Sequence, residues 1–157
     1  MKILEKVLVS VLSTLILSLL LAIIVYTPEV ERMANVYYEP FYGLFIIYFV
    51  YSLPVYVVGG VLYSFIVDKS LNRIQFQNKL PKYFTQFFLY TLGGIIVMGI
   101  YLAILHLATS PNYYGEKLTM FDSVETMIYW LLLGAIASLL FFHISIALRK
   151  TKELIIK

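Results

Sequence analysis

Two histidines are the only ionisable side chains, apart from tyrosines, that fall inside the long uncharged runs of this sequence. His106 lies near the end of its run, at the depth expected for an interfacial residue. His143 lies six residues before Arg149, about one and a half helical turns inside. An imidazole there can relay protons or bind a ligand, because it titrates near neutral pH. The alternative is a neutral histidine that hydrogen-bonds to Ser138 or Ser145 on its own helix, or to a tyrosine on a neighbouring helix.

Three tyrosines surround a proline in another run: Tyr48, Tyr51 and Tyr56 flank Pro54. A tyrosine hydroxyl inside a membrane must find a hydrogen-bond partner or line a wet cavity. Together with His143, Tyr51 and Tyr56 are therefore the candidate functional residues. They would form a polar path near the second and fourth runs.

The sequence lacks the residues that several other membrane activities need. The sequence has no cysteine, which excludes disulfides, thiolate metal sites and the paired-cysteine chemistry of quinone-linked thiol oxidoreductases. Intramembrane proteases need clustered His and Glu or a deep Ser and His, and lipid phosphotransferases need several acids at one face, where Asp68 stands alone. Four-span drug exporters depend on a glutamate in their first span, which has only hydroxyls here. We therefore expect no enzyme, no catalytic residue, no cofactor and no metal ligand.

Composition indicates the elements that must position these side chains. Of the 157 residues, 61% are hydrophobic and 13% are charged, against roughly 45–50% apolar and 25% charged in soluble domains. Four uncharged runs are long enough for helices of about 20 residues that cross a bilayer. The first exceeds the apolar core of a signal peptide and is expected to remain as a span. The sequence predicts an all-α integral membrane four-helix bundle, with one transmembrane domain over residues 1–157 and spans at 7–27, 41–67, 83–108 and 124–148.

Lysine and arginine are distributed unequally between the segments outside the spans. The N-terminus carries two, the loop after the second span four and the C-terminal tail four, which makes ten, whereas the other two loops carry only Arg32 and Lys117. The positive-inside rule predicts that both termini are cytoplasmic (N-in/C-in). The net charge of +3 then reflects topology and attraction to anionic lipid headgroups, and no nucleic-acid partner is expected.

The second span is too long to stand upright. Its 27 residues would measure about 40 Å as a straight helix, against a hydrocarbon core of about 30 Å. Pro54 lies at its centre and predicts a kink. The glycine pair Gly59-Gly60 follows, and a similar pair, Gly93-Gly94, lies at a similar depth in the third span. We expect the two spans to pack as an antiparallel hairpin with glycine against glycine.

Small residues also recur every four positions in the other two spans. Ser10, Thr14 and Ser18 line one face of the first span, and Gly134 and Ser138 have the same spacing in the fourth. Such patterns mark contacts between transmembrane helices. The contacts can lie within one bundle or between the copies of a homo-oligomer, and the sequence leaves both open.

The second span contains the stretch PVYVVGGVLYSFIVDK, with its proline, its small residues and its close on Asp68-Lys69. In this stretch, in its length and in its topology, the chain resembles a family of small uncharacterised four-span membrane proteins from Gram-positive spore-forming bacteria. The resemblance implies a multi-pass protein of the bacterial plasma membrane and supplies no catalytic residue. The sequence favours an accessory, regulatory or immunity-type protein that contacts the lipid bilayer and another membrane protein or itself. The alternative is a small transporter or channel component that uses the polar path.

Overall fold

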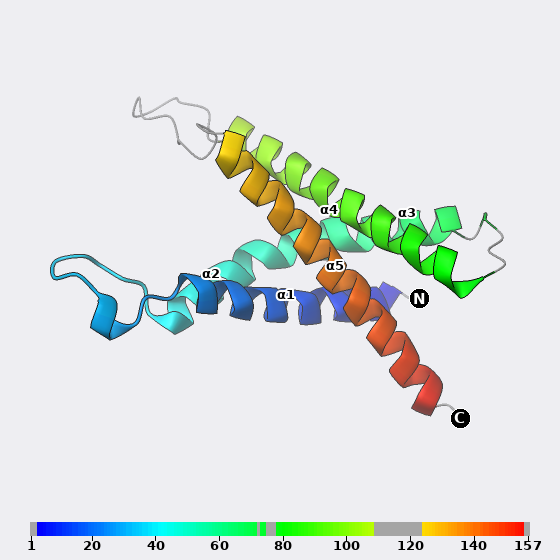
Figure 1. The fold of residues 1–157 in the computed structure, drawn as a ribbon, viewed down its shortest axis with the longest axis horizontal. Coiled ribbons are helices and arrows are strands. Elements are labelled where there is room, and N and C mark those ends of the chain that lie inside the picture. The colour runs from blue at the N-terminus through cyan, green and yellow to red at the C-terminus, as the bar shows by residue number, and fades with distance from the viewer. Residues whose placement is uncertain (1–2, 72, 75–77, 109–123, 156–157) are drawn as a thin grey trace.

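The computed structural model describes residues 3–71, 73–74, 78–108 and 124–155, and all regular elements in these ranges are helical. Figure 1 shows their arrangement. The elements are helix α1 (Ile3–Val25), the 3₁₀ helix η1 (Glu29–Glu31), helix α2 (Phe41–Pro54), the π-helix η2 (Val55–Gly60), helix α3 (Val61–Leu71), helix α4 (Lys79–Ala108) and helix α5 (Val124–Ile155). The second span thus comprises α2, η2 and α3 in one continuous run.

Four helical segments are long and apolar enough to cross a membrane: Ile3–Glu31, Phe41–Leu71, Leu80–Ile104 and Val124–Leu154. The predicted all-α architecture with four candidate membrane-spanning helices is confirmed. The helices extend beyond several of the predicted spans, since α1 begins at Ile3 and α5 continues to Ile155. The charged residues in these extensions lower hydropathy, but Lys, Arg and Glu are good helix formers, so the helices continue through them.

The spans are arranged as two pairs. The most extensive contacts join α1 to α2 and α4 to α5, while α1 also contacts α5, and η2 and α3 contact both α1 and α4. Figure 1 shows the two pairs crossing, with α2 and α4 far apart on the side where α1 ends and α2 begins. We call that side the loop end. The opposite side, where Lys6, Asp68 and Arg149 meet, is called the charged end.

Helix α1 supplies the buried stripe between the pairs. Its small residues Ser10, Thr14 and Ser18, together with Ser13, are fully buried. The Ser10 hydroxyl lies 3.0 Å from the carbonyl oxygen of Lys6 and 3.1 Å from that of Tyr56 in η2. Ser13 and Thr14 donate to carbonyls one turn earlier in α1, which satisfies their hydroxyls in an apolar setting. The predicted small-residue stripe of the first span therefore lies inside a single chain.

Pro54 ends α2, and the chain continues as the π-helix η2. A proline has no backbone N–H and its ring clashes with the carbonyl four residues earlier, so the regular α-helical ladder cannot pass through it. The wider π-turn absorbs this mismatch, and Gly59 and Gly60 at its end carry no side chains that would resist it. At the position where a kink was predicted, the structure thus shows a change of helical repeat.

The two glycine pairs do not face one another. A Cβ on Gly59 would lie 2.5 Å from Cγ1 of Val97, and a Cβ on Gly93 would collide with the ring of Tyr63. The prediction of glycine against glycine between the second and third spans is wrong. Gly59 instead makes room for Val97 of the third span and Gly93 for Tyr63 of the second, while Gly60 and Gly94 face α5.

The contact between glycines joins α4 to α5. A Cβ on Gly134 would lie 2.6 Å from the carbonyl oxygen of Gly94 and 2.6 Å from Cβ of Met98. A Cβ on Gly94 would collide with the carbonyl of Gly134 and the side chain of Ser138. The two backbones approach this closely only because both residues lack a side chain. Gly94, Gly134 and Ser138 therefore lie at the same helix crossing.

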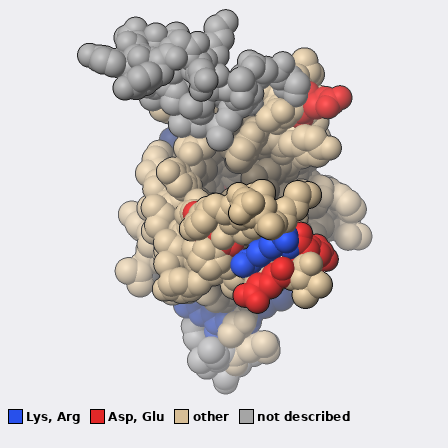
Figure 2. All heavy atoms as spheres, turned by 90° about the vertical axis from the view of Figure 1, so that its left-hand side faces the viewer, with Lys and Arg blue, Asp and Glu red and all other residues tan. Residues whose placement is uncertain are grey.

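The loop end carries the charged side chains of the segment between α1 and α2. Figure 2 views the molecule from this end and shows acidic side chains beside a basic one on a surface that is otherwise mostly uncharged. Arg32 donates from Nε to the carbonyl of Thr27, and its guanidinium lies 5.6 Å and 5.8 Å from the ring centroids of Tyr26 and Tyr38. This arginine therefore organises its own loop.

We expect Gly94→Ala to destabilise the bundle by about 1–3 kcal/mol, because the added methyl group must push the α4 and α5 backbones apart. The free energy of unfolding in detergent micelles can be followed through the single tryptophan, Trp130, which lies on α5. Gly99→Ala is the matched control on the same helix, since among the described residues its Cβ would meet Leu131 Cδ2 alone, at an ordinary 3.9 Å. Equal stability of the two variants would contradict the close crossing.

Candidate functional site

Lys6 is the most unusual buried side chain, because it is charged and 0% exposed. Its ammonium donates hydrogen bonds to Ser64 Oγ at 2.6 Å and to Asp68 Oδ2 at 2.6 Å, both from α3. The ring centroid of Phe65 lies 4.1 Å from the same nitrogen. An isolated ammonium in a low-dielectric interior is very costly, so these contacts are what permits its burial.

The other two spans join the same cluster. The Tyr90 hydroxyl of α4 donates to Ser64 Oγ at 3.2 Å, and Arg149 Nη2 of α5 lies 3.6 Å from Asp68 Oδ1. We call Lys6, Ser64, Asp68, Tyr90 and Arg149 the charged network. It connects all four candidate membrane-spanning helices at one end of the bundle. A separate ion pair between Lys152 and Glu5 joins α5 to α1 nearby.

The charged network holds the helices together through hydrogen bonds and ion pairs. Two of the three ammonium donors of Lys6 are bound, and both oxygens of Asp68 face cations. Within the part of the chain that the structure describes, no group of three His, Cys, Asp or Glu residues could hold a metal ion. The network therefore is a fixed cluster of two cations and one acid, in which the buried Lys6 is paired and the Asp68 side chain is 24% exposed.

Sequence reasoning missed this network. It counted Lys6 only among the residues that indicate topology, and it considered Asp68 only as a single acid where a lipid phosphotransferase needs several. The signal was present, since Ser64 and Asp68 are four residues apart and so share a helix face just inside the end of an apolar run. The sequence does not show that this face packs against the first turns of α1.

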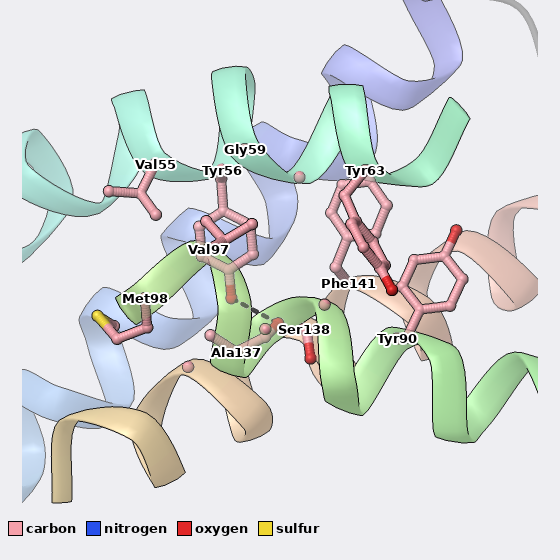
Figure 3. Close-up of a pocket in the computed structure, with 14 residues that line it drawn as sticks. Val55, Tyr56, Gly59, Tyr63, Tyr90, Val97, Met98, Ala137, Ser138 and Phe141 are labelled. Atoms are coloured by element: carbon pink, nitrogen blue, oxygen red, sulfur yellow. Dashed lines mark hydrogen bonds between the residues drawn. The ribbon is translucent and has the colours of Figure 1, made fainter. Parts of the chain in front are cut away.

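A second feature is an apolar cavity of about 60 Å³ between η2, α3, α4 and α5, shown in Figure 3. We call it the glycine pocket, because five glycines line it: Gly59, Gly60, Gly93, Gly94 and Gly134. The polar atoms around it are already bound. The Tyr56 hydroxyl donates to the carbonyl of Ala137 at 2.8 Å, and the Tyr63 hydroxyl donates to that of Leu89 at 2.8 Å. Ser138 donates to Ala135 within its own helix. The pocket therefore presents hydrocarbon.

Stacked aromatic rings form the wall between the glycine pocket and the charged end. The ring of Phe141 lies 6.4 Å from that of Tyr56 and 6.1 Å from that of Tyr90, and Tyr90 lies 5.1 Å from Phe142. All four side chains are buried. Offset stacks of this kind are rigid and bury large apolar areas. Tyr90 therefore lines the pocket with its ring and contacts the charged network with its hydroxyl.

The structure does not bring the three candidate functional residues together. Tyr51 is 64% exposed on the outside of α2, whereas Tyr56 is buried with its hydroxyl on the α5 backbone. His143 is exposed on α5, where Nδ1 donates to the carbonyl of Leu139 at 2.7 Å and leaves Nε2 to the Tyr83 hydroxyl at 3.2 Å. This is the partnership with a tyrosine of another helix that was one of the sequence alternatives. The polar path from Tyr51 past Tyr56 to His143 is therefore not assembled.

The side chain of His106 lies outside the described residues, although its backbone belongs to α4. Comparison with protein-family models, with curated protein sequences and with solved structures finds no match to this chain.

We expect Asp68→Asn to cost about 3 kcal/mol of unfolding free energy, because it leaves the buried Lys6 ammonium without its counterion. The double variant Lys6→Met with Asp68→Asn should recover most of this loss, since it removes the charge that needs compensation. Denaturation in micelles, monitored by helical circular dichroism, measures both.

Lys152→Met is the matched control for these variants, because it breaks an ion pair whose lysine is 57% exposed. Exposed pairs contribute about 1 kcal/mol or less. A loss for Asp68→Asn no larger than that for Lys152→Met, or a double variant less stable than Asp68→Asn alone, would show that the charged network does not stabilise the bundle.

Proposed function

We propose that this chain is an accessory, regulatory or immunity-type membrane protein that acts through contact with another membrane protein. The observation that carries the proposal is the state of its interior polar side chains. The hydroxyls of Tyr56 and Tyr63 at the glycine pocket are bound to backbone carbonyls, and the side chains of the charged network are bound to one another. A site for bond-making chemistry needs groups left free to act on a substrate. The proposed activity accordingly needs surface complementarity and no catalytic residue, cofactor or metal.

The second span offers the most free surface for such a partner. In its most apolar window 11% of the residues are buried inside the bundle, against 39% in that of the first span, and none of the residues of α2 is buried. The small residues that suit close helix packing are used inside the chain by α1, α4 and α5. The outer face of the second span presents bulky apolar side chains instead, including Val50, Val58 and Leu62. A partner would therefore meet an aliphatic face.

A photoreactive amino acid at Val58 tests the partner directly in native membranes. We expect a cross-link to one membrane protein at constant stoichiometry, identified by mass spectrometry after purification in mild detergent. Ile23 on α1 is the matched control, because it is 58% exposed against 61% for Val58 and lies on a different span. Recovery of the uncross-linked chain from both positions would overturn the proposal, and cross-links between two copies would identify the partner as the chain itself.

We further propose that the chain lies in a bacterial plasma membrane with both termini in the cytoplasm. The distribution of ten Lys and Arg residues against two supports this orientation. The charged network agrees with it in one respect, since the beginning of α1 and the end of α5 lie at the same end of the bundle.

Single cysteines can test the orientation without background, because the native sequence has none. An impermeant maleimide added to intact cells should label Val30→Cys, whose native side chain is 97% exposed in the segment between α1 and α2. It should label Lys150→Cys only after the cells are opened. The reverse order of labelling would contradict the proposed orientation.

A further inference from the structure

The glycine pocket has the properties of a binding site for hydrocarbon, and we propose that it holds the end of an acyl chain of a membrane lipid. Its residues belong to three of the segments that are long and apolar enough to cross a membrane: Phe41–Leu71, Leu80–Ile104 and Val124–Leu154. The medium around the pocket is then the bilayer itself. This inference goes beyond the proposed partner contact and does not rest on it.

The polarity of the pocket selects an apolar occupant. Its tyrosine and serine hydroxyls are bound to backbone carbonyls or to Ser64. Among the described residues, Ser18 Oγ is the one buried side-chain polar atom without a hydrogen-bond partner, and Ser18 does not line the pocket. A bound water needs two to four polar partners, so water and polar solutes have nothing to hold them.

The size of the pocket limits which apolar molecules can occupy it. A dry protein cavity of about 150 Å³ holds a benzene molecule. The glycine pocket measures about 60 Å³ and is partly open, so it accepts a narrow chain of a few carbons but no ring. The unbranched end of a saturated acyl chain has that cross-section. Since the surrounding lipid is equally apolar, the gain on binding comes from close van der Waals contact.

The walls of the pocket cannot collapse to fill it. The close crossing of Gly94 and Gly134 fixes α4 against α5, and the bond from the Tyr56 hydroxyl to Ala137 spaces η2 from α5. Figure 3 shows the Tyr56 side chain extending from η2 to α5, with Val97 and Met98 of α4 beside it. Val97 and Phe141 already occupy the places where side chains on Gly59 and Gly60 of η2 would lie, so the pocket is the space that remains between these contacts.

The test uses the purified full chain in vesicles of phosphatidylglycerol that contain a small fraction of the same lipid with a diazirine at the end of one acyl chain. After photolysis, mass spectrometry maps the labelled residues. We expect labelling of Val97 and Met98 to exceed that of the exposed Ile96 and Ile100 on the same helix several-fold. A diazirine near the glycerol should lose this preference. Labelling spread evenly over the exposed faces would overturn the proposal.

Variants that fill the pocket provide the control. Ala137→Leu places a larger side chain in it and should abolish the preferential labelling, while Ile136→Leu, at an exposed neighbour, should leave it unchanged. Gly60→Ala is a milder substitution, because its Cβ would lie 3.4 Å from the Phe141 ring, and it should lower the labelling partially. It keeps the test decisive if the Ala137→Leu variant does not fold. Preferential labelling that persists in both pocket variants would overturn the proposal.

The same probe in native membranes separates this proposal from the partner contact. Labelling of Val97 and Met98 there, with no protein cross-linked to Val58, would support the bound acyl chain and contradict the proposed partner contact. Loss of that labelling in native membranes, together with a protein cross-linked at Val58, overturns the lipid as the cellular occupant and supports the partner.

Discussion

The buried ammonium of Lys6 is the constraint on which the arrangement of the four spans depends. A charge at 0% exposure must be compensated where it lies, and the groups that compensate it come from α3. The other oxygen of Asp68 lies 3.6 Å from Arg149 Nη2 of α5, and Ser64 accepts a hydrogen bond from Tyr90 of α4. One unavoidable electrostatic cost thereby fixes which helix ends meet, and apolar packing could not specify this, because bulky aliphatic faces are nearly interchangeable in lipid.

Away from the charged end, glycines and the irregular helix after Pro54 determine how the helices pack. Pro54 disrupts the α-helical ladder of the second span, and the π-turn that follows it gives α4 and α5 an uneven surface to pack on. Glycines occupy the positions where a ring or a backbone approaches most closely, as at Gly93 and Gly94. The glycine pocket is the space left between these contacts, and the Tyr56 hydroxyl bond keeps it from closing.

The sequence predicted the features that depend on one helix at a time. Four spans, an irregular helix at Pro54 and the stripe of small residues in α1 each follow from composition or spacing within a single run. Features that depend on the relative rotation of two helices were not predictable. The glycine pairs suggested a symmetrical contact, but Tyr63 and Val97 fill the space and move the glycine contact to α5. The pairing of Lys6 with Asp68 was missed for the same reason, since residues 62 positions apart share no local pattern.

The two ends of the bundle are held together differently. The ion pairs that join the helices gather at the charged end, while α2 and α4 lie far apart at the loop end (Figure 1). Local opening of the bundle would therefore cost less free energy at the loop end than at the charged end.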